Sequence, residues 1–239
     1  MSSGLDLVAG PRLELLGGFQ LRSCGEVLAV PPRVQRLLAF MALQRRPLHR
    51  AYVAGRLWLD LSQDQAHGCL RTALWRAAAL RAPVVAATAT HVSLAPALEV
   101  DVHELERCAE RALHDKAPPD RGDLRRLVRA SDLVPDWYDD WAIQERERLR
   151  QLRLLALEAA GAALIRDRRY SDASLAALAA LDADPLRESA CRLLMRSYMA
   201  AGNCAEAIRQ FRVYRGRLQT SLGLEPTAEM RALVRELVA

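Results

Sequence analysis

The second half of the chain repeats a pattern with a period of 34 residues, and this repeat limits the folds open to it. Apolar and aromatic residues recur at that offset, in the pairs Leu157 and Cys191, Leu164 and Tyr198, Ala173 and Ala207, Ala177 and Phe211, and Ala180 and Tyr214. A helix-turn-helix unit of this length is typical of tetratricopeptide repeats, in which a small residue lets two helices cross closely. Repeats of this kind stack into scaffolds that bind other proteins.

The rest of the chain after Val102 is also predicted to be helical. Apolar residues recur at helical spacing, and proline or glycine separates the segments. The predicted helices span residues 101–115, 122–133, 138–168, 171–182, 185–201, 203–221 and 226–238.

The first 97 residues have a different organisation. Three short segments that alternate apolar and polar residues end at Pro31 and are predicted strands. Three predicted helices follow at residues 32–45, 50–59 and 63–81. Residues 84–94 are a predicted hairpin. This order predicts a winged helix-turn-helix domain, whose third helix enters the DNA major groove. The predicted fold class is mainly α with a small β component: an N-terminal winged helix-turn-helix followed by an all-α tetratricopeptide-like helical bundle. The predicted domains are a flexible segment 1–11, a winged helix 12–97 and a helical domain 98–239.

The positive charge is concentrated in the N-terminal part. Residues 1–98 hold 11 arginines against 5 acidic residues, a net charge of +6, whereas residues 99–239 hold 23 basic and 24 acidic residues, a net charge of −1. This asymmetry favours a polyanion as the partner of the first domain. A solvated surface with a chance excess of arginine is the alternative.

The sequence lacks the patterns of a metal site, a hydrolase or an exported protein. Its five cysteines have no CxxC spacing, His49 and His67 have no acidic or thiol partner at ligand spacing, and no serine stands in a GxSxG motif. There is no signal peptide and no uncharged apolar stretch of 18 residues. We therefore expect a cytoplasmic protein that is not an enzyme, with no catalytic residue, no metal, no cofactor and no membrane partner.

The third predicted helix carries the candidate DNA-reading residues. Ala66, Leu70, Ala73, Leu74 and Ala77 share one face and are predicted to be core. The candidates on the outer side are His67, Gly68, Arg71, Thr72, Trp75 and Arg76. Arg71 and Arg76 are the first choices, because arginine pairs bidentately with guanine or phosphate. Trp75 either packs against the wing, which we favour, or leans on the DNA backbone.

A second group of candidates is predicted to hold the DNA backbone. It comprises five arginines around the ends of the first helix and three residues of the predicted wing: Arg33, Arg36, Arg45, Arg46, Arg50, Thr88, Thr90 and His91. An ordinary solvated surface is the alternative for each arginine. An aromatic cluster at Trp137, Tyr138 and Trp141 is predicted to anchor the long helix to the bundle, with a ligand or partner pocket as the alternative.

Short segments spread over both predicted domains carry a resemblance to a known family. In the first domain they are residues 13–18 (LELLGG), 35–40 (QRLLAF), 57–58 (LW) and 70–76 (LRTALWR). In the second they are Trp141 and residues 145–149 (ERERL), 184–188 (DPLRE), 206–207 (EA) and 222–226 (LGLEP). In this order they resemble the Streptomyces antibiotic regulatory proteins, which join an OmpR-type winged helix to a bacterial transcriptional activator domain.

The resemblance implies an actinobacterial activator that binds direct repeats in double-stranded promoter DNA and recruits RNA polymerase with its sigma factor. It implies a dimer or a head-to-tail pair on the DNA, and control of a biosynthetic gene cluster. We expect a small member, without the ATPase domain of larger ones. The chain departs from the family at Cys69, where many members carry asparagine, at the alanines 77–79, where arginine is commoner, and in a predicted wing turn without glycine.

Two functions of different classes follow from these residues. The first is a DNA-binding activator, which the charge asymmetry favours. The second is a protein-interaction module with weakened DNA binding that acts through its repeats, which Cys69 and the three alanines favour. A repressor that occludes a promoter shares the DNA-binding step of the first.

Overall fold

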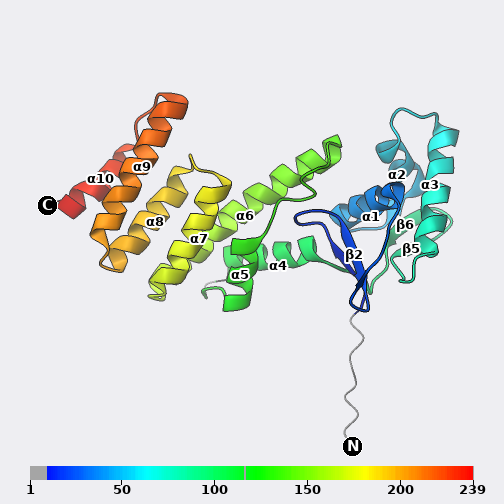
Figure 1. Cartoon of the computed structure of the whole chain (residues 1–239), viewed down its shortest axis with the longest axis horizontal. Helices are drawn as coiled ribbons and strands as arrows, with labels where there is room; N and C mark the ends of the chain where they lie inside the picture. Colours follow the sequence, from blue (N-terminus) through cyan, green and yellow to red (C-terminus); the bar gives the residue numbers. More distant parts are fainter. Residues whose placement is uncertain (1–9, 116, 239) are drawn as a thin grey trace, which may run out of the picture. The chain divides into compact units, whose positions relative to one another are not determined.

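The computed structural model describes residues 10–115 and 117–238, so residues 1–9 of the predicted flexible segment lie outside the described residues (Figure 1). The chain forms two compact units. The first unit contains the residues up to Glu104 together with Ser131–Arg146, and the second contains Leu105–Ala130 together with the chain from Glu147 on. This division differs from the predicted domain boundary, because residues 131–146 fold with the N-terminal part.

A small sheet begins the first unit. Strands β1 (Arg12–Glu14), β2 (Gln20–Ser23), β3 (Glu26–Val27) and β7 (Glu99–Val100) are arranged in the order β3-β2-β1-β7. Leu13 of β1 pairs with Leu21 of β2, and both side chains are buried. Gly17 in the turn has a φ of 86°, a left-handed conformation that glycine adopts without strain.

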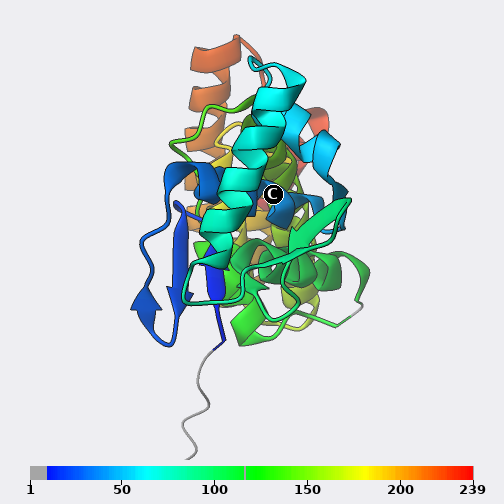
Figure 2. The same cartoon turned by 90° about the vertical axis from the view of Figure 1, so that its right-hand side faces the viewer.

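Three helices and a three-stranded sheet complete the winged helix-turn-helix. The helices are α1 (Pro32–Gln44), α2 (Arg50–Leu57) and α3 (Gln63–Ala78), and the strands β4 (Leu48–His49), β6 (His91–Leu94) and β5 (Val85–Ala87) pair in that order. α3 packs on α1 and α2, and α1 buries an apolar face that includes Leu37, Phe40 and Met41. Figure 2 shows α3, in cyan, beside the green hairpin β5–β6.

Residues 131–146 are tied to the first unit by backbone hydrogen bonds and aromatic contacts. The amide of Gly17 donates to the carbonyl of Asp132 at 2.7 Å, and the amide of Val134 donates to the carbonyl of Leu15 at 2.8 Å. Within the segment, the Arg146 guanidinium donates to the carbonyls of Leu133, Val134 and Trp137 at 2.6–2.8 Å and holds them in place. The backbone hydrogen bonds to Leu15 and Gly17, with the aromatic contacts, account for the membership of this segment in the first unit.

The half-buried carboxylate of Asp101, at the start of α4 (Asp101–His114), holds β1 in place. Its oxygens accept the amides of Leu15, Leu16 and Val102 at 2.7–3.0 Å. Burial raises the pKa of Asp101, and these amides act in the opposite direction.

Replacing Asp101 by asparagine is expected to lower the unfolding free energy by about 1–3 kcal/mol, because the amide nitrogen would face backbone donors. Urea unfolding followed by tryptophan fluorescence measures the loss. All four tryptophans, Trp58, Trp75, Trp137 and Trp141, lie in the first unit, so the signal reports on that unit. The exposed Asp136→Asn serves as the control and should change stability by less than about 0.5 kcal/mol. Equal stability of the two variants would contradict this role of Asp101.

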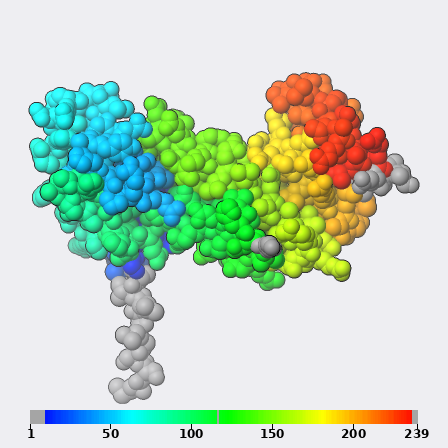
Figure 3. Space-filling view, turned by 180° about the vertical axis from the view of Figure 1, so that it is seen from behind, coloured from blue at the N-terminus to red at the C-terminus, as the bar shows by residue number. Residues whose placement is uncertain are grey.

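The second unit is helical throughout its described residues. Its helices are α5 (Arg121–Arg129), α7 (Tyr170–Ala183), α8 (Glu188–Ala200), α9 (Cys204–Leu222) and α10 (Ala228–Val238), with most of α4 (Asp101–His114) and α6 (Asp140–Arg166). Figure 3 shows α9 and α10, in orange and red, packed against each other. None of the described helices is long and apolar enough to cross a bilayer.

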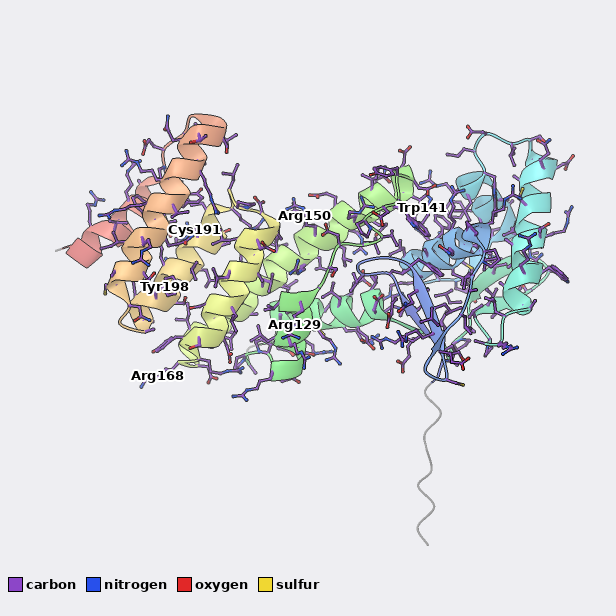
Figure 4. The ribbon with its side chains drawn as sticks, viewed as in Figure 1. Arg129, Trp141, Arg150, Arg168, Cys191 and Tyr198 are labelled. Carbon is purple, nitrogen blue, oxygen red and sulfur yellow. The ribbon has the colours of Figure 1, made fainter. Side chains whose placement is uncertain are left out.

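The predicted 34-residue repeat is confirmed as two helix pairs, α6–α7 and α8–α9. Ala173 of α7 and Ala207 of α9 are both fully buried, as are Leu157 and Cys191 at the equivalent positions of α6 and α8. Cys191 and Tyr198 are labelled on α8 in Figure 4. A Cβ at Gly161 would lie 2.5 Å from Cδ2 of Leu193, so the absence of a side chain lets α6 and α8 approach closely.

The buried polar groups of the second unit are structural. Asp123 is 7% exposed and accepts two hydrogen bonds from Arg111 at 2.7 Å and one from Cys108 at 3.2 Å. Burial raises the pKa of Cys108 to about 11 and that of Cys191 to about 12. Both thiols therefore stay protonated at neutral pH and are poor nucleophiles.

Candidate nucleic-acid interface

The start of α3 is fixed by a capping box. The Ser62 hydroxyl accepts the amide of Gln65, and the Gln65 side chain accepts the amide of Ser62 at 3.1 Å. These two bonds satisfy donors that a helix start otherwise leaves without a partner. They set the first turn of the helix that carries the candidate residues.

Replacing Ser62 by alanine is expected to lower the unfolding free energy of the first unit by about 1 kcal/mol, the usual cost of losing an N-cap. Tryptophan-detected urea unfolding measures the change. Gln63→Ala, at the exposed first residue of the same helix, is the matched control and should stay within about 0.5 kcal/mol of the parent protein. A loss of the same size in both variants would show that the cap is not the cause.

The two faces of α3 are largely as the helical period predicts. Ala66, Leu70, Ala73 and Ala77 are buried, while Leu74 is half-buried. The outer side carries the predicted residues, with Arg71, Thr72, Trp75 and Arg76 exposed and His67 and Gly68 half-buried. Two arginines therefore stand on the solvent side of a 16-residue helix.

Trp75 does not pack against the wing as predicted. Its side chain is 72% exposed, the largest exposed aromatic surface on α3. This exposure contradicts packing against the wing and places Trp75 on the solvent side of α3.

Arg71 lies between two hollows on the surface of the first unit. One, of about 260 Å³, brings together His49 and Arg50 at the start of α2, His67 on α3 and Thr90 in the wing turn. The other, of about 480 Å³, lies between Arg33 on α1 and the residues Gly68 and Thr72. The structure thus gathers candidate residues from four segments around one side chain.

Sequence reasoning missed two residues of this surface. Gln65 lines the second hollow, and His49 lines the first and forms an edge-on ring contact with His91 at a centroid separation of 5.4 Å. The position of His49 immediately before Arg50 at a helix start was the signal that could have identified it.

The wing turn is closed by hydroxyl groups instead of glycine. The Thr88 hydroxyl accepts the amide of His91 at 3.0 Å, and the Thr90 hydroxyl bonds Nδ1 of His91 at 2.9 Å. Thr88, Thr90 and His91 are exposed, as the prediction for a wing requires. The hairpin therefore forms although its turn lacks glycine.

The five arginines near α1 do not form one cluster. Arg33 and Arg50 lie beside α3, whereas Arg45 and Arg46 line a separate hollow with Ser93 and Leu94 at the other end of α1. A helix of 13 residues is about 20 Å long, which separates Arg33 from Arg45 and Arg46. Arg36 belongs to neither group.

Arg36 has a different environment from the one predicted. It is ion-paired with Asp139 and lines a cavity beside the loop after α2. A guanidinium already bound to a carboxylate is a poor phosphate clamp, so we leave Arg36 out of the candidate DNA surface.

The aromatic cluster anchors residues 131–146 to the first unit and not to the helical bundle as predicted. Trp141, labelled in Figure 4 at the start of α6, contacts Phe40 of α1 edge-on with centroids 5.4 Å apart. Trp137 stacks on Phe19 at 6.2 Å and contacts Trp141 at 6.1 Å. Tyr138 is 83% exposed and takes no part in this packing.

Comparisons with known proteins agree with this architecture. A solved structure similar in fold is that of Mycobacterium tuberculosis EmbR in complex with a low affinity phosphopeptide, at 20% sequence identity and a TM-score of 0.71. The match covers 95% of this chain and 65% of that one, so this chain spans about two thirds of the EmbR structure. At this identity the likeness establishes the fold alone. No curated protein matched the chain.

The model of one protein family, described as the bacterial transcriptional activator domain, matches residues 100–238. The match begins close to the predicted boundary at residue 98, confirms the resemblance drawn from the sequence, and covers more than half of the chain. The protein therefore belongs to the bacterial transcriptional activator domain family.

Proposed function

We propose that the protein is a DNA-binding transcription activator that binds direct repeats in promoter DNA through α3 and the wing. The observation that carries the proposal is the solvent-exposed face of α3, with Arg71, Trp75 and Arg76, on a fold of winged helix-turn-helix layout. A major groove about 12 Å wide admits one helix, and arginine on its outer face can pair with guanine O6 and N7. Membership of a family of transcriptional activators supports the same function.

Residues around α3 would hold the DNA backbone. Arg33 and Arg50 each line a hollow that Arg71 also lines, and Thr90 of the wing turn lines the hollow with Arg50. Contacts to phosphate fix the position of a protein on the duplex, while contacts to bases give specificity. The N-terminal excess of positive charge supports this assignment of roles.

The remaining partners follow from the proposed activity. Two copies in a head-to-tail arrangement, or a dimer, would occupy a pair of direct repeats, and the helical unit would contact RNA polymerase with its sigma factor. The regulated genes would form a biosynthetic cluster. The proposal places the protein in the bacterial cytoplasm, with the chromosome.

Transcription from a purified template tests the activator function. RNA polymerase with its sigma factor is supplied with the promoter upstream of the gene, with and without the protein. An increase in transcript supports the proposal, whereas a decrease indicates a repressor that occludes the promoter. An unchanged transcript level, with the protein bound to the template, contradicts polymerase recruitment.

A second candidate function is a protein-interaction module with weakened DNA binding. Cys69 stands on α3 in the hollow between Arg33 and Arg71, where the asparagine of many family members could reach a bound duplex. Ala78 and Ala79 are exposed at the end of the helix. These residues provide little hydrogen bonding to a duplex. Absence of binding to any duplex, with retained folding, would favour this function.

A further inference from the structure

Helix α5 of the second unit carries three arginines at intervals of four residues, Arg121, Arg125 and Arg129, which we call the arginine row. All three residues are exposed, and Arg129 is labelled in Figure 4. Residues four apart lie about 6 Å apart along a helix and turn by about 40° from one to the next. The row is therefore a line of positive charge about 12 Å long on one side of α5.

The carboxylates of α5 do not neutralise the row. None of its three arginines forms an ion pair or a side-chain hydrogen bond with another described residue. Asp123 is 7% exposed and binds Arg111 of α4 through both of its oxygens. The carboxylate of Asp120 caps the helix by accepting the amide of Asp123 at 2.7 Å. The positive charge of the row is therefore available to an external anion.

The row disfavours the helix that carries it. Like charges four residues apart on a helix repel each other, and the row contains two such pairs. Arg121 also stands at the first residue of α5, where the positive end of the helix dipole opposes a cation. Residues 99–239 together have a net charge of −1, so the row is a local concentration of positive charge. An unfavourable arrangement that no contact among the described residues offsets indicates that these arginines bind a partner.

The surroundings of the row favour a nucleic acid over a protein as that partner. Leu124 and Leu127 of α5 are 5% and 0% exposed, so the helix presents charge and no exposed large apolar side chain. The centre of a protein–protein interface is depleted of charged residues, whereas a protein–DNA interface is polar and strongly positive. Each strand of a duplex presents a regular line of phosphates, which a line of cations can meet.

We propose that the arginine row of α5 binds the phosphate backbone of double-stranded DNA. The second unit then adds a contact without sequence preference to the one proposed for α3, so this inference rests on the proposed DNA-binding function. Each guanidinium donates paired hydrogen bonds to a phosphate. Because these contacts involve no base, the row raises the affinity for every duplex and leaves selection of the promoter to α3.

Anisotropy titrations of the full chain test the row with the promoter region upstream of the gene and a scrambled duplex of equal length. The row variant, Arg125→Ala with Arg129→Ala, is expected to bind both duplexes about tenfold more weakly at about 100 mM salt. The slope of log affinity against log salt concentration should fall by about two, one for each phosphate that is no longer bound. The ratio of the two affinities should stay within about twofold of that of the parent protein.

Two further variants separate the row from net charge and from arginine itself. The α9 variant, Arg212→Ala with Arg217→Ala, removes the same charge from exposed residues of the same unit and should change the affinity less than about threefold. The lysine variant, Arg125→Lys with Arg129→Lys, keeps the charge and should stay within about threefold of the parent protein.

Thermal unfolding followed by circular dichroism checks that the row has no structural role. The row variant is expected to melt no lower than the parent protein, because it removes like-charge repulsion within α5. A lower melting temperature would mean that the arginines stabilise the fold, and it would overturn the proposal.

The binding results that would overturn the proposal are an unchanged affinity of the row variant for both duplexes and a loss no larger than that of the α9 variant. Unchanged duplex binding with weaker binding of labelled poly-L-glutamate would identify an acidic protein as the partner instead. Failure of the proposed function has a different signature. A parent protein without preference for the promoter contradicts reading by α3 but leaves the row intact, whereas no binding to any duplex contradicts both.

Discussion

Replacing Arg71 and Arg76 together by alanine is expected to weaken binding to promoter DNA by about a hundredfold or more. Each arginine that pairs with a base or phosphate contributes about 1–3 kcal/mol, and both side chains stand exposed on the outer face of α3. The dependence of affinity on salt should also flatten, and its slope should fall by about one for each phosphate that is no longer bound. Anisotropy titrations of a labelled duplex at several salt concentrations measure both effects.

The control for this variant is a second arginine pair with the same spacing. Arg212 and Arg217 are also five residues apart on an exposed helix face, in α9 of the second unit. Their replacement by alanine changes the net charge by the same amount and should alter the affinity less than about threefold, because neither residue belongs to the proposed DNA surface of the first unit. Similar losses in the two double variants would mean that net charge, and not the α3 face, determines binding.

Replacing Phe40 by alanine is expected to destabilise the first unit by about 3–5 kcal/mol, the usual cost of removing a buried aromatic ring. The side chain is 1% exposed and lies against Trp141 at a centroid distance of 5.4 Å. The loss includes the aromatic pair that holds residues 131–146 to α1. Urea unfolding followed by tryptophan fluorescence measures it, because two tryptophans of that segment report directly.

Tyr138→Ala is the control for the Phe40 variant. Tyr138 stands in the same aromatic segment but is 83% exposed, so its loss should change stability by less than about 0.5 kcal/mol. A loss below about 1 kcal/mol for Phe40→Ala would contradict the packing of residues 131–146 on α1.

The helices of this chain were predictable because local signals delimit them. Proline and glycine stand near most helix ends, and apolar residues recur at helical spacing within each helix. The observed α1, Pro32–Gln44, ends one residue before the predicted end. The observed α9, Cys204–Leu222, begins and ends one residue later than predicted. The repeat added a second, independent signal for α6 to α9.

The parts that were not predicted depend on contacts between distant residues. β4 and β7 have two residues each, and they are strands only because β6 and β1 lie beside them. The attachment of residues 131–146 depends on backbone hydrogen bonds to Leu15 and Gly17 and on a contact between Phe40 and Trp141, 101 residues apart. No local pattern contains this information, although the density of aromatic residues near Trp137 marked the segment as unusual.

The candidate site, like the fold, was predictable only where local sequence patterns determine it. The exposure of Arg71 and Arg76 follows from the helical period alone, and the structure shows both exposed. The surroundings of the arginines near α1 do not follow from it, because Arg36 meets a carboxylate supplied by residue 139. The sequence placed Trp75 on the outer side of α3 but favoured its packing against the wing, which its 72% exposure contradicts.

The most direct test of DNA binding through α3 is fluorescence anisotropy with the promoter region upstream of the gene and a scrambled duplex of equal length. Titrations at about 50 and about 200 mM salt separate phosphate contacts from base contacts. Our account predicts tighter binding to the promoter at both concentrations and a fall in affinity of at least about tenfold between them. Equal affinity for both duplexes, or no binding to either, would contradict it.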